Sequence, residues 1–194
     1  MIEPEDTMAV TATRRRFTLA EYHRMGEVGI LRPDDRVELI DGEIIEMAPI
    51  GTLHAATVTR ICEFFVRRLG DRATIRSQNP LLIPDHESEP EPDVMLLTRR
   101  ADFYARAHPV PADVRLLIEV ADSSLRYDRL TKFPLYARAG VAEAWLVDVE
   151  HRRVELHRRP AERGYAEISR PETGDGFASL AFPDIEVTGA DMLG

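Results

Sequence analysis

Three ionisable residues stand at positions that simple packing does not explain. Asp93 follows Pro92 at the start of an expected strand, and Glu119 interrupts a nearly continuous apolar strand at 115–121. Lys132 lies 13 residues after Glu119, on the helix expected next. Mg²⁺ typically takes one or two carboxylates, and a nearby ammonium can orient or activate a water and offset charge on a phosphate. The set therefore indicates metal-assisted hydrolysis of a phosphoester.

The expected elements bring Lys132 and Glu119 to one height on the sheet. If the helix begins near Ser124, Lys132 lies eight residues into a helix that runs back along the preceding strand. Eight helical residues span about 12 Å, which is the length of about three to four strand residues. We therefore expect the Asp93 and Glu119 carboxylates to share one cation, with the Lys132 ammonium in the same cleft. Pro134 removes one backbone hydrogen bond from this helix, so we expect a kink there.

Lys132 is the only lysine among the 25 lysine and arginine residues of the chain. A compositional bias toward arginine can replace lysine at positions where either cation is suitable. It cannot do so at a site that needs a compact, titratable ammonium. A lysine left by chance would fall at this position about one time in 25. The alternative is a surface ion pair with Asp128, which lies one helical turn earlier. Both roles can hold together.

The other patterns predict an α/β (α+β mixed) fold with a mixed central sheet. Asp41-Gly42 between two apolar segments predicts a hairpin at 36–47, and apolar residues at helical spacing predict an amphipathic helix from His54 to Leu69. Further expected elements are a helix from Thr18 to about Met25, a helix from Ser123 or Ser124 to Ala139, strands at 73–77, 80–84, 92–97, 115–121, 143–149, 152–158, 165–169 and 177–187, and a solvated acidic loop from Asp85 to Glu91.

Length and composition bound the class of protein. The 194 residues suit a single domain at 16–194 after a flexible segment at 1–15, and 44% hydrophobic residues are too many for a disordered chain. No apolar run approaches the roughly 20 residues of a membrane span, and no secretory signal is visible. We therefore expect a cytoplasmic protein that makes no membrane contact.

Charge and cysteine content restrict the kinds of site. A formal charge of −9 argues against a broad basic face that grips nucleic acid, so a nucleic-acid enzyme would need a local patch. Cys62 is the only cysteine, which excludes an internal disulfide and a thiolate metal cluster. Any metal must therefore be held by oxygen or imidazole ligands.

The ordered motifs carry a family resemblance from Phe17 to Asp148. Glu91-Pro92-Asp93 followed by Leu117-Ile118-Glu119-Val120 resembles the PD-(D/E)xK restriction-endonuclease-like superfamily. Longer segments are similar to the Uma-two family of bacterial restriction endonucleases; they are VELIDGEIIEMAPIGTLH, EPDVMLL and LLIEVADSSLRYDRLTKFPLYARAGVAEAWLVD. The resemblance implies a restriction-endonuclease-like fold, with a central mixed sheet flanked by helices and additional strands at the N- and C-terminal ends.

The resemblance also implies roles for particular residues. The superfamily pattern places a lysine two residues after the glutamate, where this chain has Ala121, and the resemblance implies that Lys132 has taken over its role. The family has an acidic residue at the position of Glu38 and a histidine at that of His54, which implies that both belong to the catalytic site. The alternatives are a structural hydrogen bond for Glu38 and a satisfied core position for His54.

The remaining candidates are contacts to substrate or metal. The backbone carbonyl of Val120 is a further candidate metal ligand, and Gln78, near Asp93 in the chain, is a candidate contact to the site or to the nucleic-acid backbone. Arg126 and Arg129 are candidate phosphate contacts. Structural roles are expected for four other residues, which are Asp128, Tyr136, Trp145 and Asp148.

These observations predict a nuclease that hydrolyses phosphodiester bonds, with DNA as the expected partner and Mg²⁺ or Mn²⁺ as the cofactor. Asp93 and Glu119 would hold the metal while Lys132 assists the water. A homodimer is expected, since two sites related by a two-fold axis cut both strands of a duplex most simply. One alternative is a non-catalytic nucleic-acid-binding or interaction module, which the acidic net charge favours. Another is a metal-dependent hydrolase of a smaller phosphoester.

Overall fold

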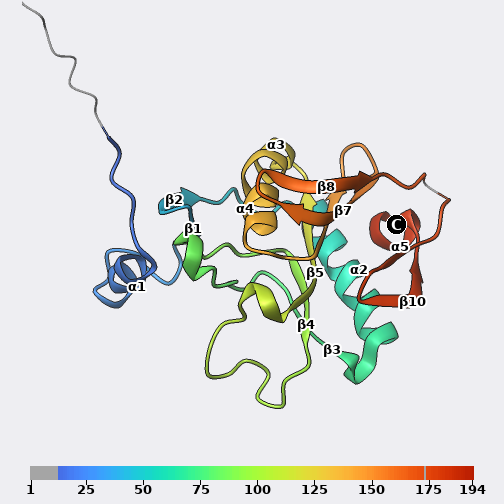
Figure 1. Ribbon diagram of the computed structural model, residues 1–194, viewed down its shortest axis with the longest axis horizontal. Helices are drawn as coiled ribbons and strands as arrows, with labels where there is room; N and C mark the ends of the chain where they lie inside the picture. The colour runs from blue at the N-terminus through green and yellow to red at the C-terminus, as the bar shows by residue number, and fades with distance from the viewer. Residues whose placement is uncertain (1–12, 173) are drawn as a thin grey trace, which may run out of the picture.

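The computed structural model describes residues 13–172 and 174–194 (Figure 1). Residues 1–12 of the predicted N-terminal segment lie outside this part. The helices are α1 (Leu19–Glu27), α2 (Thr52–Leu69), α3 (Leu125–Tyr127), α4 (Phe133–Arg138) and α5 (Gly189–Leu193). The strands are β1 (Val37–Ile40), β2 (Glu43–Glu46), β3 (Ala73–Arg76), β4 (Val94–Thr98), β5 (Val114–Ala121), β6 (Glu143–Asp148), β7 (Arg153–Ala161), β8 (Gly164–Ser169), β9 (Phe177–Ser179) and β10 (Phe182–Val187).

A six-stranded mixed sheet forms the centre of the molecule, in the order β3-β4-β5-β6-β7-β8. β5 and β6 run parallel, and the other neighbouring pairs are antiparallel. A parallel pair needs a crossover connection, which α3 and α4 supply. The predicted mixed central sheet is therefore confirmed, and the additional terminal strands form two separate pairs, β1 with β2 and β9 with β10.

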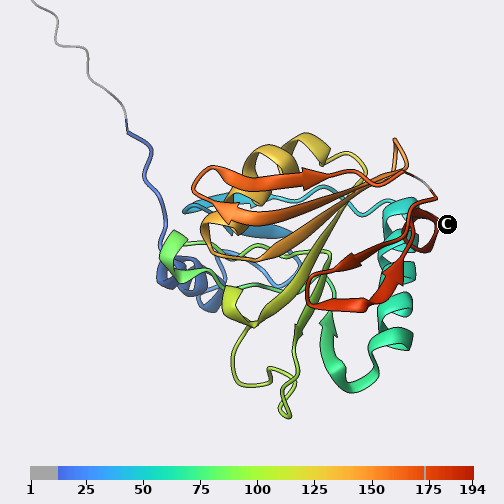
Figure 2. The same cartoon turned by 45° about the vertical axis from the view of Figure 1, so that its right-hand side comes forward.

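Helices cover both faces of the sheet and enclose an apolar layer on each (Figure 2). Val58, Ile61 and Phe65 of α2 pack on one face, together with β9, β10 and α5. Phe133 and Leu135 of α4 pack on the other face. Because β5 is covered on both sides, its sequence is a nearly continuous apolar run in which Glu119 is an exception.

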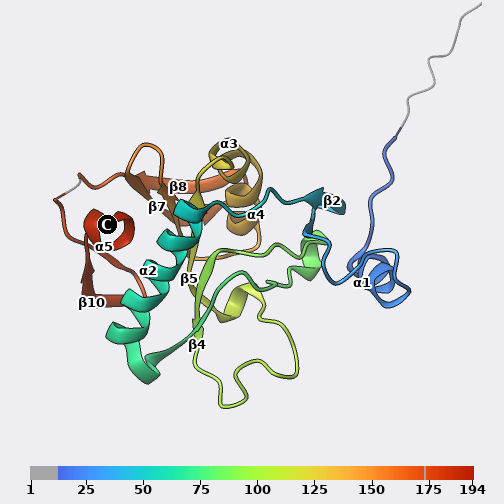
Figure 3. The same cartoon turned by 180° about the vertical axis from the view of Figure 1, so that it is seen from behind.

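The predicted hairpin is present as β1 and β2. Asp41 and Gly42 occupy its turn with φ of 47° and 77°, the left-handed conformation that a tight hairpin turn requires. Seen from behind, α1 and this hairpin lie on the side of the molecule away from α5 and the C-terminus (Figure 3). The short first helix is also as predicted, with Thr18 as its N-cap and Glu21 completing a capping box.

The helix predicted from Ser123 or Ser124 to Ala139 is present at residues 125–138, but it is not α-helical throughout. Between α3 and α4, residues 128–132 form a π-helical turn, in which the Phe133 N–H donates to the Asp128 carbonyl five residues earlier. Pro134 follows and has no N–H with which to continue a regular helix. The departure from a regular α-helix beside Pro134 is therefore a π-helical turn, a rare geometry that is frequent at functional sites.

Two predictions for the segment at 80–91 are also wrong. Residues 80–84 form no strand, and Ile83 makes a single bridge to Ser88. The acidic loop is not fully solvated, because Ser88 and Glu89 are buried where Glu89 exchanges backbone hydrogen bonds with Leu39 of β1.

Within the described ranges, the structure has no helix of the length and apolarity that a membrane span requires.

Candidate active site

The pairing of β4 with β5 places Asp93 and Glu119 opposite each other. Val94 pairs with Ile118, so the residues one step beyond that pair face each other at the same end of the sheet. The Asp93 N–H donates to Glu119 Oε2 at 3.2 Å, and the Val120 N–H donates to Asp93 Oδ2 at 2.8 Å. Like charges directly opposite on neighbouring strands are destabilising, so this pair needs a nearby cation or a proton.

The Lys132 ammonium supplies part of that positive charge. Its Nζ lies 2.8 Å from Glu119 Oε1 and 3.4 Å from Glu38 Oε2, and the residue is 6% exposed. The Tyr136 hydroxyl donates to the same Glu119 oxygen at 2.5 Å. The alternative of a surface ion pair with Asp128 is therefore wrong, because the lysine side chain points inward.

The hairpin carries Glu38 to this ammonium. Glu38 is 2% exposed, and the Tyr127 hydroxyl donates to its Oε1 at 3.4 Å. Arg138 at the end of α4 holds the hairpin turn through two hydrogen bonds to the Asp41 carboxylate, at 2.8 and 3.0 Å. The Asp41 side chain therefore has a structural role in addition to the conformation of the turn.

His54 reaches the site from the first turn of α2. Its Nε2 lies 3.1 Å from Asp93 Oδ1. This hydrogen bond raises the pKa of His54, and burial acts in the opposite direction. Its Nδ1 is buried and finds no hydrogen-bond partner within the described residues. The contact with Asp93 places His54 at the candidate site, where it can orient that carboxylate.

These side chains line one cleft of about 330 Å³. Gln78 also lines it, with a left-handed backbone (φ 51°) and an N–H that donates to the carbonyl groups of Pro92 and Asp93. The lining is strongly acidic and, apart from His54, has two basic side chains, those of Arg36 and Lys132. The carboxylates that line it are those of Glu38, Glu46, Glu91, Asp93, Glu119, Asp122 and Asp128.

Burial in this cleft shifts several pKa values. Burial raises the pKa of Glu119 to about 8, although the Lys132 ammonium acts in the opposite direction. Burial also raises the pKa of Asp128. For Lys132, burial alone would lower the pKa, but Glu119, Tyr136 and Glu38 outweigh it and the pKa lies well above its ordinary value. Lys132 is therefore a protonated donor in this state and cannot take a proton from a water.

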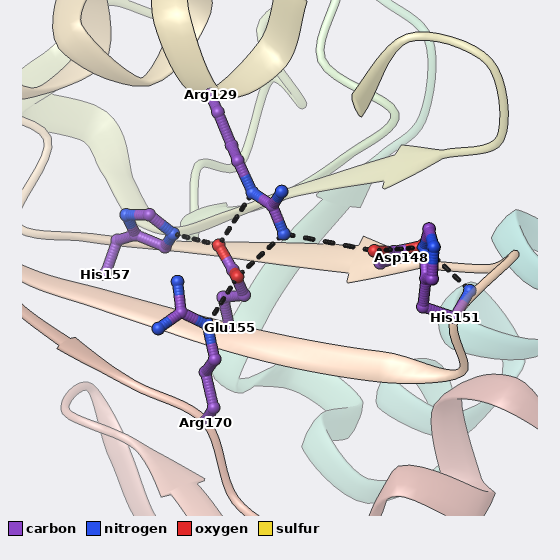
Figure 4. Close-up of polar contacts among 6 residues, drawn as sticks. All are labelled: Arg129, Asp148, His151, Glu155, His157 and Arg170. Atoms are coloured by element: carbon purple, nitrogen blue, oxygen red, sulfur yellow. Dashed lines mark hydrogen bonds and ion pairs between the residues drawn. The ribbon is translucent and has the colours of Figure 1, made fainter. Parts of the chain in front are cut away.

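The structure does not bring Arg126 and Arg129 into the cleft. Arg126 is exposed to solvent. The Arg129 guanidinium makes two hydrogen bonds to the Glu155 carboxylate of β7, at 2.8 and 3.2 Å (Figure 4). Its guanidinium is thus held by a buried carboxylate away from the residues that line the cleft, and the predicted phosphate contact by Arg129 stays a prediction.

Sequence reasoning missed the site roles of Tyr127 and Asp128, which line the cleft, and of Tyr136, which is buried behind it and donates to Glu119. Asp128, Lys132 and Tyr136 are spaced four residues apart, which places them on one helix face, and this spacing was the signal available for Asp128 and Tyr136. Asp128 accepts a hydrogen bond from the Ser124 hydroxyl at 2.6 Å. The sequence carries no comparable signal for Tyr127, because its partner in the site is 89 residues away in the chain.

The donor set at Asp93 and Glu119 fits a hard divalent cation. In a strand, the N–H and C=O of one residue point to the same side, so the Val120 carbonyl is directed to the side on which its N–H meets Asp93. No three His, Cys, Asp or Glu side chains in the described ranges are arranged to hold an ion by themselves. A cation bound here would therefore complete its shell with water or substrate oxygens, as Mg²⁺ commonly does.

A solved structure shares this fold, and a family model matches most of this sequence. A crystal structure of a putative nuclease belonging to DUF820 from Anabaena variabilis has a TM-score of 0.72 and 15% sequence identity, and covers 91% of this chain and 97% of its own. At 15% sequence identity, this structural similarity shows only that the two proteins share a fold. No curated protein matches the sequence. The Uma2 family, described as "Putative restriction endonuclease", matches residues 19–190. This match covers most of the chain, and we conclude that the protein belongs to the Uma2 family.

Proposed function

We propose that this protein is a metal-dependent nuclease that hydrolyses phosphodiester bonds of DNA with Mg²⁺ or Mn²⁺. The observation that carries the proposal is the contact between Lys132 and Glu119, with Asp93 directly opposite, inside one acidic cleft. Membership of the Uma2 family supports nuclease activity. The choice of metal, residues and substrate rests on the chemistry of the cleft.

Asp93, Glu119 and the Val120 carbonyl are the groups that would hold the cation. When bound, it lowers the pKa of a water and neutralises charge on the phosphate. The cleft carboxylates alone would repel a phosphodiester, so an acidic site for an anionic substrate requires such a counter-charge.

The side chains around the carboxylates have distinct roles in this proposal. Lys132 Nζ donates hydrogen bonds that orient a water and offset charge on a phosphate oxygen. Glu38 helps to hold that ammonium, and His54 fixes one oxygen of Asp93. Gln78 at the edge of the cleft is the candidate contact to the DNA backbone.

The direct test is cleavage of single-stranded DNA, duplex DNA and RNA in Mg²⁺, in Mn²⁺ and in a chelator. We expect cation-dependent cleavage of DNA that Asp93→Asn and Glu119→Gln abolish. Asp184→Asn is the matched control, because it makes the same carboxylate-to-amide change outside the cleft. Asp184 is exposed and paired with Arg72.

Other outcomes separate the alternatives. Binding of DNA with no cleavage in either cation would favour the interaction module. Hydrolysis of bis-p-nitrophenyl phosphate without cleavage of any nucleic acid would favour a smaller phosphoester as substrate. Either result contradicts the proposed nuclease.

A further inference from the structure

A second polar cluster lies on the same face of the sheet as the candidate site. Glu119 of β5 pairs with Leu146 of β6, and Leu146 pairs with Glu155 of β7. Residues in one cross-strand row point to the same face of a sheet, and strands are about 4.8 Å apart, so Glu155 lies about 10 Å from Glu119 along this row. Figure 4 shows the side chains that converge on the Glu155 carboxylate.

Three side chains donate hydrogen bonds to the buried Glu155 carboxylate, which is 1% exposed. Arg129 donates from Nε and from its terminal nitrogen at 3.2 and 2.8 Å, and Arg170 Nε donates at 2.6 Å. His157 Nε2 lies 3.1 Å from the same carboxylate. Burial alone would raise the pKa of Glu155, but the hydrogen bonds from His157, Arg170 and Arg129 lower it to about 2. The carboxylate is therefore a stable anionic anchor.

Arg129 stands in the π-helical turn at 128–132, next to Asp128 and three residues before Lys132. A π-helical turn is an uncommon geometry that the surrounding packing must fix. A guanidinium that meets a carboxylate through two parallel hydrogen bonds fixes orientation as well as distance. One side of this turn is therefore anchored to β7, while its Lys132 side chain extends to Glu119 on β5.

We propose that Arg129 is a positioning residue, whose paired hydrogen bonds to Glu155 fix the π-helical turn and thereby hold the Lys132 ammonium against Glu119. The consequence for catalysis rests on the proposed nuclease function. The consequence for the position of Lys132 does not, so the two can be tested separately.

The single lysine makes the position measurable without any activity. Protein labelled with ¹⁵N only in lysine gives one side-chain Nζ resonance, that of Lys132. We expect Arg129→Gln to shift this resonance and to speed exchange of its protons, because the ammonium loses its fixed place beside Glu119. The metal-dependent kcat should fall about tenfold or more while KM changes less than about twofold, as expected when a group is misplaced but substrate contacts remain.

Arg170→Gln is the matched control. It removes the same charge and another donor to the same carboxylate, but Arg170 follows β8 and lies outside the turn. We expect it to leave the Nζ resonance and kcat nearly unchanged. Melting temperatures of both variants show whether each still folds. If Arg129→Gln does not fold, Arg129→Lys keeps the charge and loses the paired geometry, and the same fall in kcat is expected.

An unchanged Nζ resonance in Arg129→Gln would overturn the proposal. So would a rise in KM with a weaker salt dependence and constant kcat, which would make Arg129 a phosphate contact. If the wild type cleaves no nucleic acid, the proposed function fails, and the Nζ resonance still decides whether Arg129 positions Lys132.

Discussion

The buried ammonium of Lys132 explains why a chain with 24 arginines keeps a lysine here. Its Nζ lies beside Glu119 and Glu38, and all three side chains are buried at the base of the cleft. We predict that Lys132→Arg lowers the metal-dependent cleavage rate by about 10² or more. The guanidinium keeps the charge, but it is wider and holds its donors in a different plane.

Single-turnover cleavage, measured beside the melting temperature, checks this prediction. Arg115→Lys is the matched control, since it makes the reverse exchange at an exposed position of β5. Equal cleavage by Lys132→Arg and the wild type would remove the lysine from the mechanism.

The raised pKa of Glu119 predicts how cation binding depends on pH. The pKa of Glu119 is about 8, so at lower pH its carboxyl group carries a proton. This proton must leave before the group can bind a cation. The apparent affinity for Mn²⁺ should therefore rise with pH and level off above about 8, by up to about tenfold per unit below it. Calorimetric titration between pH 6 and 9 measures this, and a constant affinity would contradict it.

At the scale of elements, the cluster around Glu155 links the helical crossover to β7. The pKa of Glu155 lies near 2, below its ordinary value of 4.5, so ionised Glu155 stabilises the fold above pH 4.5 and this contribution is lost as pH falls toward 2. We predict a loss of about 2 kcal/mol over that interval, less than the full shift implies because the Arg129 and Arg170 side chains reach solvent.

Urea unfolding at several pH values measures that contribution. In Glu155→Gln, the free energy of unfolding should vary less between pH 4.5 and 2 than in the wild type. Glu162→Gln, at an exposed position in the turn after β7, should retain the wild-type dependence. Identical pH dependence in both variants would show that the cluster contributes little to stability.

The net charge of the whole molecule affects its affinity for DNA. With a net charge of −9 and an acidic cleft, the protein should repel DNA at long range when no divalent cation is bound. We predict at least about tenfold tighter binding of duplex DNA in Ca²⁺ than in a chelator at 0.1 M salt, since Ca²⁺ takes the same oxygen ligands as Mg²⁺. Fluorescence anisotropy at matched ionic strength measures it. Equal affinity in both buffers would count against a metal-bridged complex.

The oligomeric state is also a property of the whole molecule. We predict a homodimer, because two sites related by a two-fold axis can cut the two strands of a duplex together. Light scattering at micromolar concentration should then give a mass near twice the 22.0 kDa of one chain. A mass near that of a single chain would contradict the prediction.

Features that depend on local chemistry could be predicted from the amino-acid sequence. Asp41-Gly42 specified the hairpin because few residues accept its left-handed turn. The strand, crossover and strand at 114–148 followed from apolar runs and their breaks. The spacing of Glu119 and Lys132 predicted their approach because helix and strand rises are fixed, and the structure brings them within 2.8 Å.

Features that join distant parts of the chain could not be predicted from the sequence and became visible in the folded molecule. The contact of Tyr127 with Glu38 and that of Arg129 with Glu155 each depend on partners brought together by folding. The burial of Glu89 likewise depends on its pairing with β1. The local periodicity of the sequence does not show which distant segment will pack over a given residue. That packing decides whether a polar side chain contacts water, a buried partner or the active-site cleft.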